Sequence, residues 1–128
     1  MAFGSTSTIN VYATSTHIGG QLSTGFASST TSGATVTIDW NNGNNQGFLL
    51  DANTTFTFTG GRIGGKYLLK LRQDATGSRT VTWPTSVIWS GGTAPTLTTT
   101  ANKNDFIGFA FMSTTSYYGL ANSLNFAD

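Results

Sequence analysis

The side chains that could perform chemistry are few and widely separated. The chain has no cysteine and no glutamate, so its side-chain carboxylates are five aspartates: Asp39, Asp51, Asp74, Asp105 and Asp128. Glycoside hydrolysis needs two carboxyl groups that converge on one sugar. Three of the five lie beside predicted turns, where an aspartate commonly bonds the nearby backbone. We therefore expect no catalytic residues, and a depolymerase-like enzyme is kept only as an alternative.

The single histidine, His17, has no partners for metal binding or nucleophilic catalysis. A structural or catalytic metal site draws on several His, Cys or carboxylate ligands, and no G-x-S-x-G sequence marks a nucleophile elbow. The asparagine-rich segment 41–45 offers amide oxygens, but Asp39 is the one carboxylate near it, so a calcium loop is not indicated. The sequence predicts neither a metal site nor a cofactor.

Five of the six basic residues fall between Arg62 and Arg79. Within this stretch Lys70 and Arg72 alternate with Leu69 and Leu71, so in a strand both cations point away from the apolar face. Such a basic strip could dock on an acidic capsid surface, because arginine pairs well with carboxylates. The simpler interpretation is a solvated face whose charges protect an edge strand from aggregation.

Aromatic residues suggest a second kind of site. Trp83 and Trp40 follow the phase of apolar neighbours and are expected in the core, whereas Trp89 and Tyr118 are candidates for an exposed platform on which a sugar could stack. Core or subunit-interface positions are the competing interpretation for both residues.

Composition sets the class of protein. The 128 residues (13.4 kDa) fit one domain, and only 9% of them are charged, against roughly 25% in typical soluble domains. A formal net charge of +1 gives no field for binding nucleic acid or an anionic membrane. The start of the chain lacks the basic and apolar regions of a signal peptide. The weakly charged, Thr-rich surface favours association, and we expect a homo-oligomer, with a trimer preferred.

Short alternating runs of apolar and hydroxyl residues predict an all-β fold: a two-sheet antiparallel sandwich of jelly-roll-like type. The expected strands are 9–13, 21–26, 34–40, 47–50, 54–59, 66–73, 79–83, 87–89, 96–99, 105–112, 116–121 and 123–126. A three-residue loop at 75–77 with Gly77 left-handed would make 66–73 and 79–83 a hairpin, in which Leu71 faces Val81 and Leu69 faces Trp83. Residues 34–128 form the sandwich. Residues 1–33, poorer in alternation, are either an N-terminal arm that reaches a neighbouring subunit or plain edge strands.

The string Leu-Arg-Gln-Asp-Ala-Thr-Gly-Ser-Arg-Thr-Val-Thr-Trp-Pro at 71–84 is followed by Trp89, Gly91-Gly92, a segment at 94–98, Lys103 and Asp105. With Thr37-Ile38-Asp39-Trp40 before it and Tyr117-Tyr118-Gly119 after it, this pattern resembles a β-module that recurs in bacteriophage virion proteins. The resemblance covers about 34–126 and implies a virion surface component, either a capsid decoration protein or part of a tail fibre or receptor-binding protein, and it supplies no catalytic residues to carry over.

From these observations we predict a non-enzymatic phage structural protein on the virion surface. The main hypothesis is a capsid decoration or cement subunit, whose partners are copies of itself and the major capsid protein or other virion proteins. The alternative is a tail-fibre or receptor-binding module that recognises a host surface glycan. Nucleic acid and membranes are not expected as partners.

Overall fold

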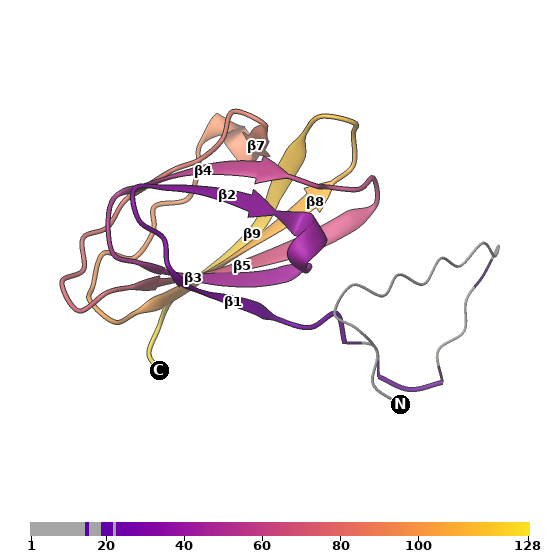
Figure 1. The fold of residues 1–128 in the computed structure, drawn as a ribbon. Coiled ribbons are helices and arrows are strands. Elements are labelled where there is room, and N and C mark those ends of the chain that lie inside the picture. The colour runs from indigo at the N-terminus through magenta and orange to yellow at the C-terminus, as the bar shows by residue number, and fades with distance from the viewer. Residues whose placement is uncertain (1–14, 16–18, 22) are drawn as a thin grey trace.

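The computed structural model describes residues 15, 19–21 and 23–128 (Figure 1). Within these ranges the chain forms nine strands and two short 3-10 turns. The strands are β1 (Ala27–Thr31), β2 (Thr35–Asp39), β3 (Asn45–Leu50), β4 (Thr54–Thr59), β5 (Gly65–Gln73), β6 (Val81–Thr82), β7 (Val87–Trp89), β8 (Asn104–Phe111) and β9 (Tyr117–Phe126), and the turns are η1 (Trp40–Asn42) and η2 (Ser90–Gly92). A search of the described residues finds no helix with the length and apolar character of a membrane span.

The strands form two sheets, as predicted. The larger sheet has six strands in the order β1-β3-β5-β8-β9-β7, and the smaller has three in the order β2-β4-β6. Figure 1 shows β2 and β4 as one layer above β1, β3 and β5. From β1 to β6 the chain alternates between the sheets, so each successive pair of strands adds one coil to the stack. The all-β, two-sheet prediction is confirmed.

Pairing within the sheets differs from the antiparallel arrangement predicted from sequence. The coils stack in parallel, β1 on β3, β3 on β5, β2 on β4 and β4 on β6, and β7 also pairs in parallel with β9. In the described residues antiparallel pairing joins β5 to β8 and β8 to β9. Parallel neighbours need a long crossover connection. From β1 to β6 each crossover runs through the opposite sheet, whereas the connection from β7 to β9 includes β8 of the same sheet.

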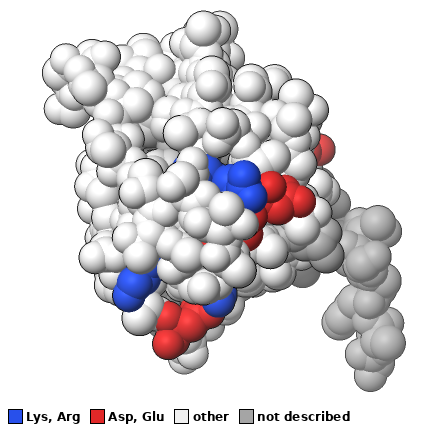
Figure 2. All heavy atoms as spheres, turned by 90° about the vertical axis from the view of Figure 1, so that its left-hand side faces the viewer, with Lys and Arg blue, Asp and Glu red and all other residues white. Residues whose placement is uncertain are grey.

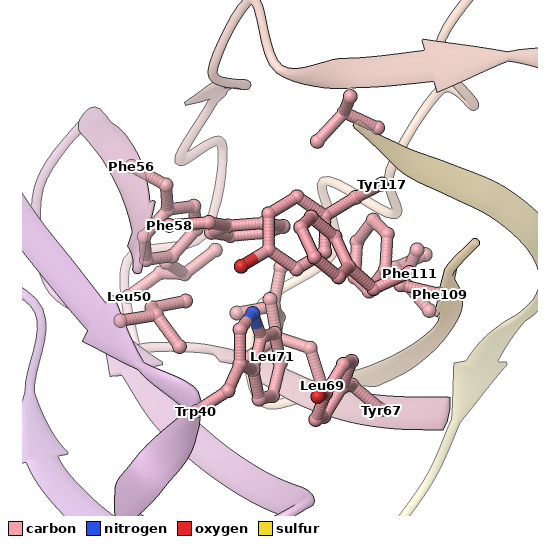
Figure 3. Close-up of a cluster of buried hydrophobic side chains, with 13 residues drawn as sticks. Trp40, Leu50, Phe56, Phe58, Tyr67, Leu69, Leu71, Phe109, Phe111 and Tyr117 are labelled. Carbon is pink, nitrogen blue, oxygen red and sulfur yellow. The ribbon is translucent and has the colours of Figure 1, made fainter. Parts of the chain in front are cut away.

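The core lies between the two sheets and is rich in aromatic rings (Figure 3). Apolar side chains at every second position of β4, β5 and β8 point inward, as the alternation predicted. Trp40 stacks on Tyr67 with ring centroids 4.7 Å apart, and Phe58 meets Phe109 edge to face at 5.1 Å. The expected burial of Trp40 is confirmed at 3% exposure, and Trp83 packs partly buried against the same cluster.

The predicted hairpin does not form, although Gly77 is left-handed at φ 73°. β5 already pairs with β3 on one edge and β8 on the other, so no edge is left for residues 79–83. The chain instead crosses to the smaller sheet, where β6 pairs with β4. The side chain of Gln73 replaces part of the missing ladder: its Oε1 accepts from Arg79 N at 2.9 Å, and its Nε2 donates to the carbonyls of Arg79 and Thr98 at 2.9 and 2.8 Å.

The N-terminal segment contributes an edge strand, β1, to the larger sheet, which is the simpler of the two interpretations of residues 1–33 for the part that is described. The predicted strand at 9–13 lies outside the described residues. The described residues of 21–26 are not in a strand, and neither is 96–99. Thr98 uses its backbone differently, since its N–H donates to the buried carboxylate of Asp105 at 2.7 Å.

Replacing Gln73 tests the crossover. Gln73 is 2% exposed, and Gln73→Ala would remove the hydrogen-bond partner of one part-buried N–H and two part-buried carbonyls. We expect the free energy of unfolding to fall by about 2–4 kcal/mol. Urea titration monitored by tryptophan fluorescence measures it. Gln21→Ala, which removes the same side chain from an exposed position, should change stability by no more than about 0.5 kcal/mol, and equal effects of the two variants would contradict the assignment.

Candidate binding surfaces

The aspartates are engaged in holding the fold. Each carboxylate accepts at least one hydrogen bond, and the donors are Asn41 N for Asp39, Gly33 N for Asp51, Thr76 N and Gly77 N for Asp74, Thr98 N and Asn125 N for Asp105, and Asn104 Nδ2 for Asp128. Turn capping is confirmed for Asp74, whereas Asp51 accepts from Ser32 Oγ and Gly33 N, 19 and 18 positions earlier in the chain, and not from its own nearby backbone. Asp105 instead joins two distant segments, and Asp39 ends β2 and caps η1 rather than lying mid-strand. Among the described residues no three His, Cys, Asp or Glu side chains gather as metal ligands. His17 lies outside the described residues.

Charged groups occupy little of the surface, and some of them lie beside a group of opposite charge. On the face shown in Figure 2, blue and red side chains adjoin each other in two places on a largely white surface. The ion pairs of the described residues are Arg79 with Asp74, at 2.7 Å, and Arg72 with Asp128. The hydrogen bond from Arg79 holds the pKa of the Asp74 carboxyl below its usual range, and the same contact raises the pKa of Arg79. This pair closes the turn after β5.

The predicted basic strip lies on the outer face of the larger sheet. Lys70 and Arg72 point away from the core, opposite Leu69 and Leu71, as the alternation required. Their strand, β5, is third of six in the sheet, so the interpretation that these charges protect an edge strand is wrong. Lys70 forms no ion pair with the described residues, whereas Arg72 pairs with Asp128.

A shallow pocket of about 130 Å³ lies at this basic strip. Phe26, Ser28, Gly47 and Leu49 line it together with Lys70 and Arg72. The ring of Phe26 sits over Gly47: a Cβ atom on Gly47 would come within 2.6 Å of the Phe26 Cζ. The pocket therefore combines an aromatic wall, a glycine floor and two cations.

The proposed aromatic platform is not assembled. Trp89 pairs with Gly119 and Tyr118 with Ile88 on adjacent strands, and successive residues of a strand point to opposite faces. Trp89 lies on the inner side, where its ring meets Trp83 at 5.2 Å and Phe109 at 5.8 Å. Tyr118 lies on the outer side beside the exposed Ile88. The two candidates thus belong to different surfaces.

A glycine-rich loop between β4 and β5 forms a second exposed feature. The Tyr117 hydroxyl accepts from Gly61 N at 3.0 Å, and the Tyr67 hydroxyl accepts from Arg62 N at 2.9 Å. A Cβ atom on Gly61 would lie 2.4 Å from the Tyr117 hydroxyl, so the loop needs glycine there. Two core tyrosines therefore hold the loop backbone while Ile63, 64% exposed, projects from it.

Sequence reasoning did not identify the roles of Phe26 and Gly47 in the pocket. Phe26 falls in the segment interpreted as an arm, and Gly47 lies 21 positions further along the chain. Their contact exists because β1 pairs with β3 in parallel. No signal in the sequence marks that pairing.

The described chain is an all-β sandwich of two sheets whose carboxylates accept hydrogen bonds within the fold. Residues 30–108 match the family described as "Putative phage tail fibre C-terminal domain". The match covers more than half of the 128 residues, so the chain belongs to this family and is a bacteriophage virion structural protein, as the resemblance predicted. Searches of curated proteins and of solved structures gave no match.

Removing the hydroxyl that holds the glycine loop gives a pH-dependent prediction. Burial raises the pKa of the Tyr117 phenol above its ordinary value of 10.0, and the hydrogen bond from Gly61 N opposes this in part. The unfolded chain ionises near pH 10 while the folded chain keeps its proton, so stability is full below pH 10 and falls as the pH rises further. Tyr117→Phe should lose about 1 kcal/mol at pH 7 and show a weaker alkaline decline, measured by urea titration from pH 7 to 11.

The neighbouring Tyr118→Phe is the matched control, because it removes a phenol hydroxyl from the outer surface. It should leave both the stability at pH 7 and the alkaline decline unchanged. An alkaline profile of Tyr117→Phe identical to that of the unmodified protein would contradict the role assigned to Tyr117.

Proposed function

We propose that this domain is part of a phage tail fibre and acts by binding the surface of the host cell. The observation that carries the proposal is the family match over 30–108, which runs from the end of β1 through most of β8 and so spans strands of both sheets. This match favours the tail-fibre alternative over capsid decoration, the main hypothesis from sequence. Nothing in the fold singles out a capsid shell as the partner.

The domain works without catalysis in this proposal. This proposal is supported by the carboxylates of the described residues, which already accept hydrogen bonds from backbone or side-chain donors. Separate turns or segment junctions contain Asp39, Asp51, Asp74 and Asp105. Binding then depends on two kinds of exposed surface, the outer face of the larger sheet and the loop that carries Ile63.

We also propose that copies of the chain associate, with the trimer as the state to be tested. The β7–β9 side of the larger sheet exposes Ile88 (47%), Tyr118 (36%) and Leu120 (59%). No charged side chain lies on β7 or β9, so burying this side desolvates few ionic groups. It is separate from the basic strip on β5, which leaves that strip available for other partners.

Locating the domain on the particle tests the tail-fibre proposal. Gold-labelled antibodies against the domain should decorate the tail in electron micrographs, and the purified domain should compete with phage for adsorption to host cells. Label confined to the capsid shell would overturn the proposal and restore the decoration hypothesis. Label on the tail without any competition would place the domain there in a purely structural role, contrary to the proposal.

The association proposal has its own test. Ile88→Ser combined with Tyr118→Ser should lower the solution mass of the oligomer, measured by light scattering after size exclusion, because it removes apolar area from the proposed contact. Ile63→Ser, on an exposed residue outside the contact, should leave the mass unchanged. A monomeric mass for the unmodified chain at micromolar concentration would refute preassembly.

A further inference from the structure

The pocket at the basic strip is built by four segments that converge on the outer face of the larger sheet. The strand register places Ser28, Gly47 and Lys70 in one row across β1, β3 and β5. The next outward row contains Leu49 and Arg72. Residues in such rows point to the same side of a sheet, so the two cations and Leu49 border one depression, which Phe26 closes from the segment before β1.

The Phe26 ring is 54% exposed, yet its position is defined by Gly47. Any side chain on Gly47 would occupy the place of the ring, because even a Cβ atom would be 2.6 Å from the Cζ and 3.3 Å from the Cε2 of Phe26. The pocket therefore presents a flat apolar wall to solvent. A ligand with one apolar face would bury that wall and the adjoining Leu49.

The charged side chains at the pocket favour an anionic ligand. Lys70 and Arg72 both line the pocket, and Lys66 lies four positions before Lys70 on the same outward side of β5. The carboxylate at the rim is that of Asp128, which binds Arg72; the other four aspartates lie in turns or segment junctions away from the pocket lining. Arg72 thus already holds a carboxylate, and its planar guanidinium suits a second carboxylate or a phosphate.

We propose that this pocket is a subsite for one acidic unit of a host surface polysaccharide, a sugar that bears a carboxylate or phosphate group. The C–H face of the pyranose ring packs on Phe26, and the acidic group binds Lys70 and Arg72. The volume, about 130 Å³, is below the roughly 300–1,000 Å³ of sites that enclose drug-sized ligands. A single ring held at the surface while the polymer continues on either side fits this size. The inference rests on the proposed function and specifies its receptor chemistry.

Isothermal titration of the intact chain tests the chemistry directly. The probes are trigalacturonate and glucose 6-phosphate, with fully methyl-esterified trigalacturonate as the uncharged match and inorganic phosphate as an anion without a ring. We expect millimolar or tighter binding of at least one acidic sugar, weakened by added salt, and weaker binding of both the ester and inorganic phosphate. Equal binding of the ester, equal binding of inorganic phosphate, or no binding of either acidic sugar would overturn the inference.

Variants locate the binding. Lys70→Gln and Arg72→Gln should each lower the affinity for the acidic sugar by about tenfold or more, the usual cost of losing a charge-assisted hydrogen bond. Gly47→Ala should also lower this affinity, because the new methyl group displaces the Phe26 ring while both cations remain. Lys66→Gln is the matched control: it removes the same charge from the same strand and face but from outside the pocket lining. An equal loss in Lys66→Gln would show a diffuse charge effect and overturn the site.

Thermal melting and solution mass accompany each variant. Unchanged melting with lost binding supports the subsite, whereas a changed oligomer mass in Lys70→Gln or Arg72→Gln would identify this face as a subunit interface and overturn it. The outcome is separable from that of the proposed function. If Lys70→Gln and Arg72→Gln still compete with phage for adsorption, the tail-fibre proposal stands and the acidic receptor is rejected. If the unmodified chain binds the acidic sugar but does not compete for adsorption, the subsite stands and the proposed function is rejected.

Discussion

Both edges of β5 are hydrogen-bonded to other strands, in parallel to β3 and antiparallel to β8, and the rest of the structure follows from this. With no edge available to the next segment, the chain after Gln73 must leave the larger sheet, and β6 joins the smaller one. β5 is also where stacked coils meet the antiparallel β8–β9 pair. A strand in this position has its backbone satisfied, so its outward side chains, including Lys70 and Arg72, stand on a fixed scaffold.

Sequence alternation predicted which side of each strand faces the core, but it could not predict the neighbours of the strand. Leu69, Leu71, Val81 and Trp83 do contribute to one core, as expected, yet the first two come from the larger sheet and the other two from the smaller side. A period of two residues is the same in parallel and antiparallel sheets. The coils are also unequal: Ala27 pairs with Gln46, but Thr54 pairs with Val81. No fixed repeat therefore marks the winding in the sequence.

The same limit applies to the binding surfaces. The shared face of Lys70 and Arg72 follows from local alternation and was predicted. The opposite faces of Trp89 and Tyr118 depend on the pairing of β7 with β9, where Trp89 is set beside Gly119 and so leans inward on Phe109. Phe26 and Gly47 meet through another long-range parallel pair. Sites built within one strand can be predicted from sequence, whereas sites built across strands require the register.

The outer face of β1, β3 and β5 is unusual for a parallel sheet, because parallel sheets are generally covered on both faces. Here the smaller sheet covers the inner face, and no described strand lies over the outer one. The aliphatic stems of Lys70 and Arg72 can shield apolar neighbours such as Leu49 while their charged ends stay in water. Since only 9% of residues are charged, few other charged groups surround the two cations on this face. The stacked coils thus provide a sheet face with few charges, on which two cations and one aromatic ring would determine the ligand of the proposed subsite.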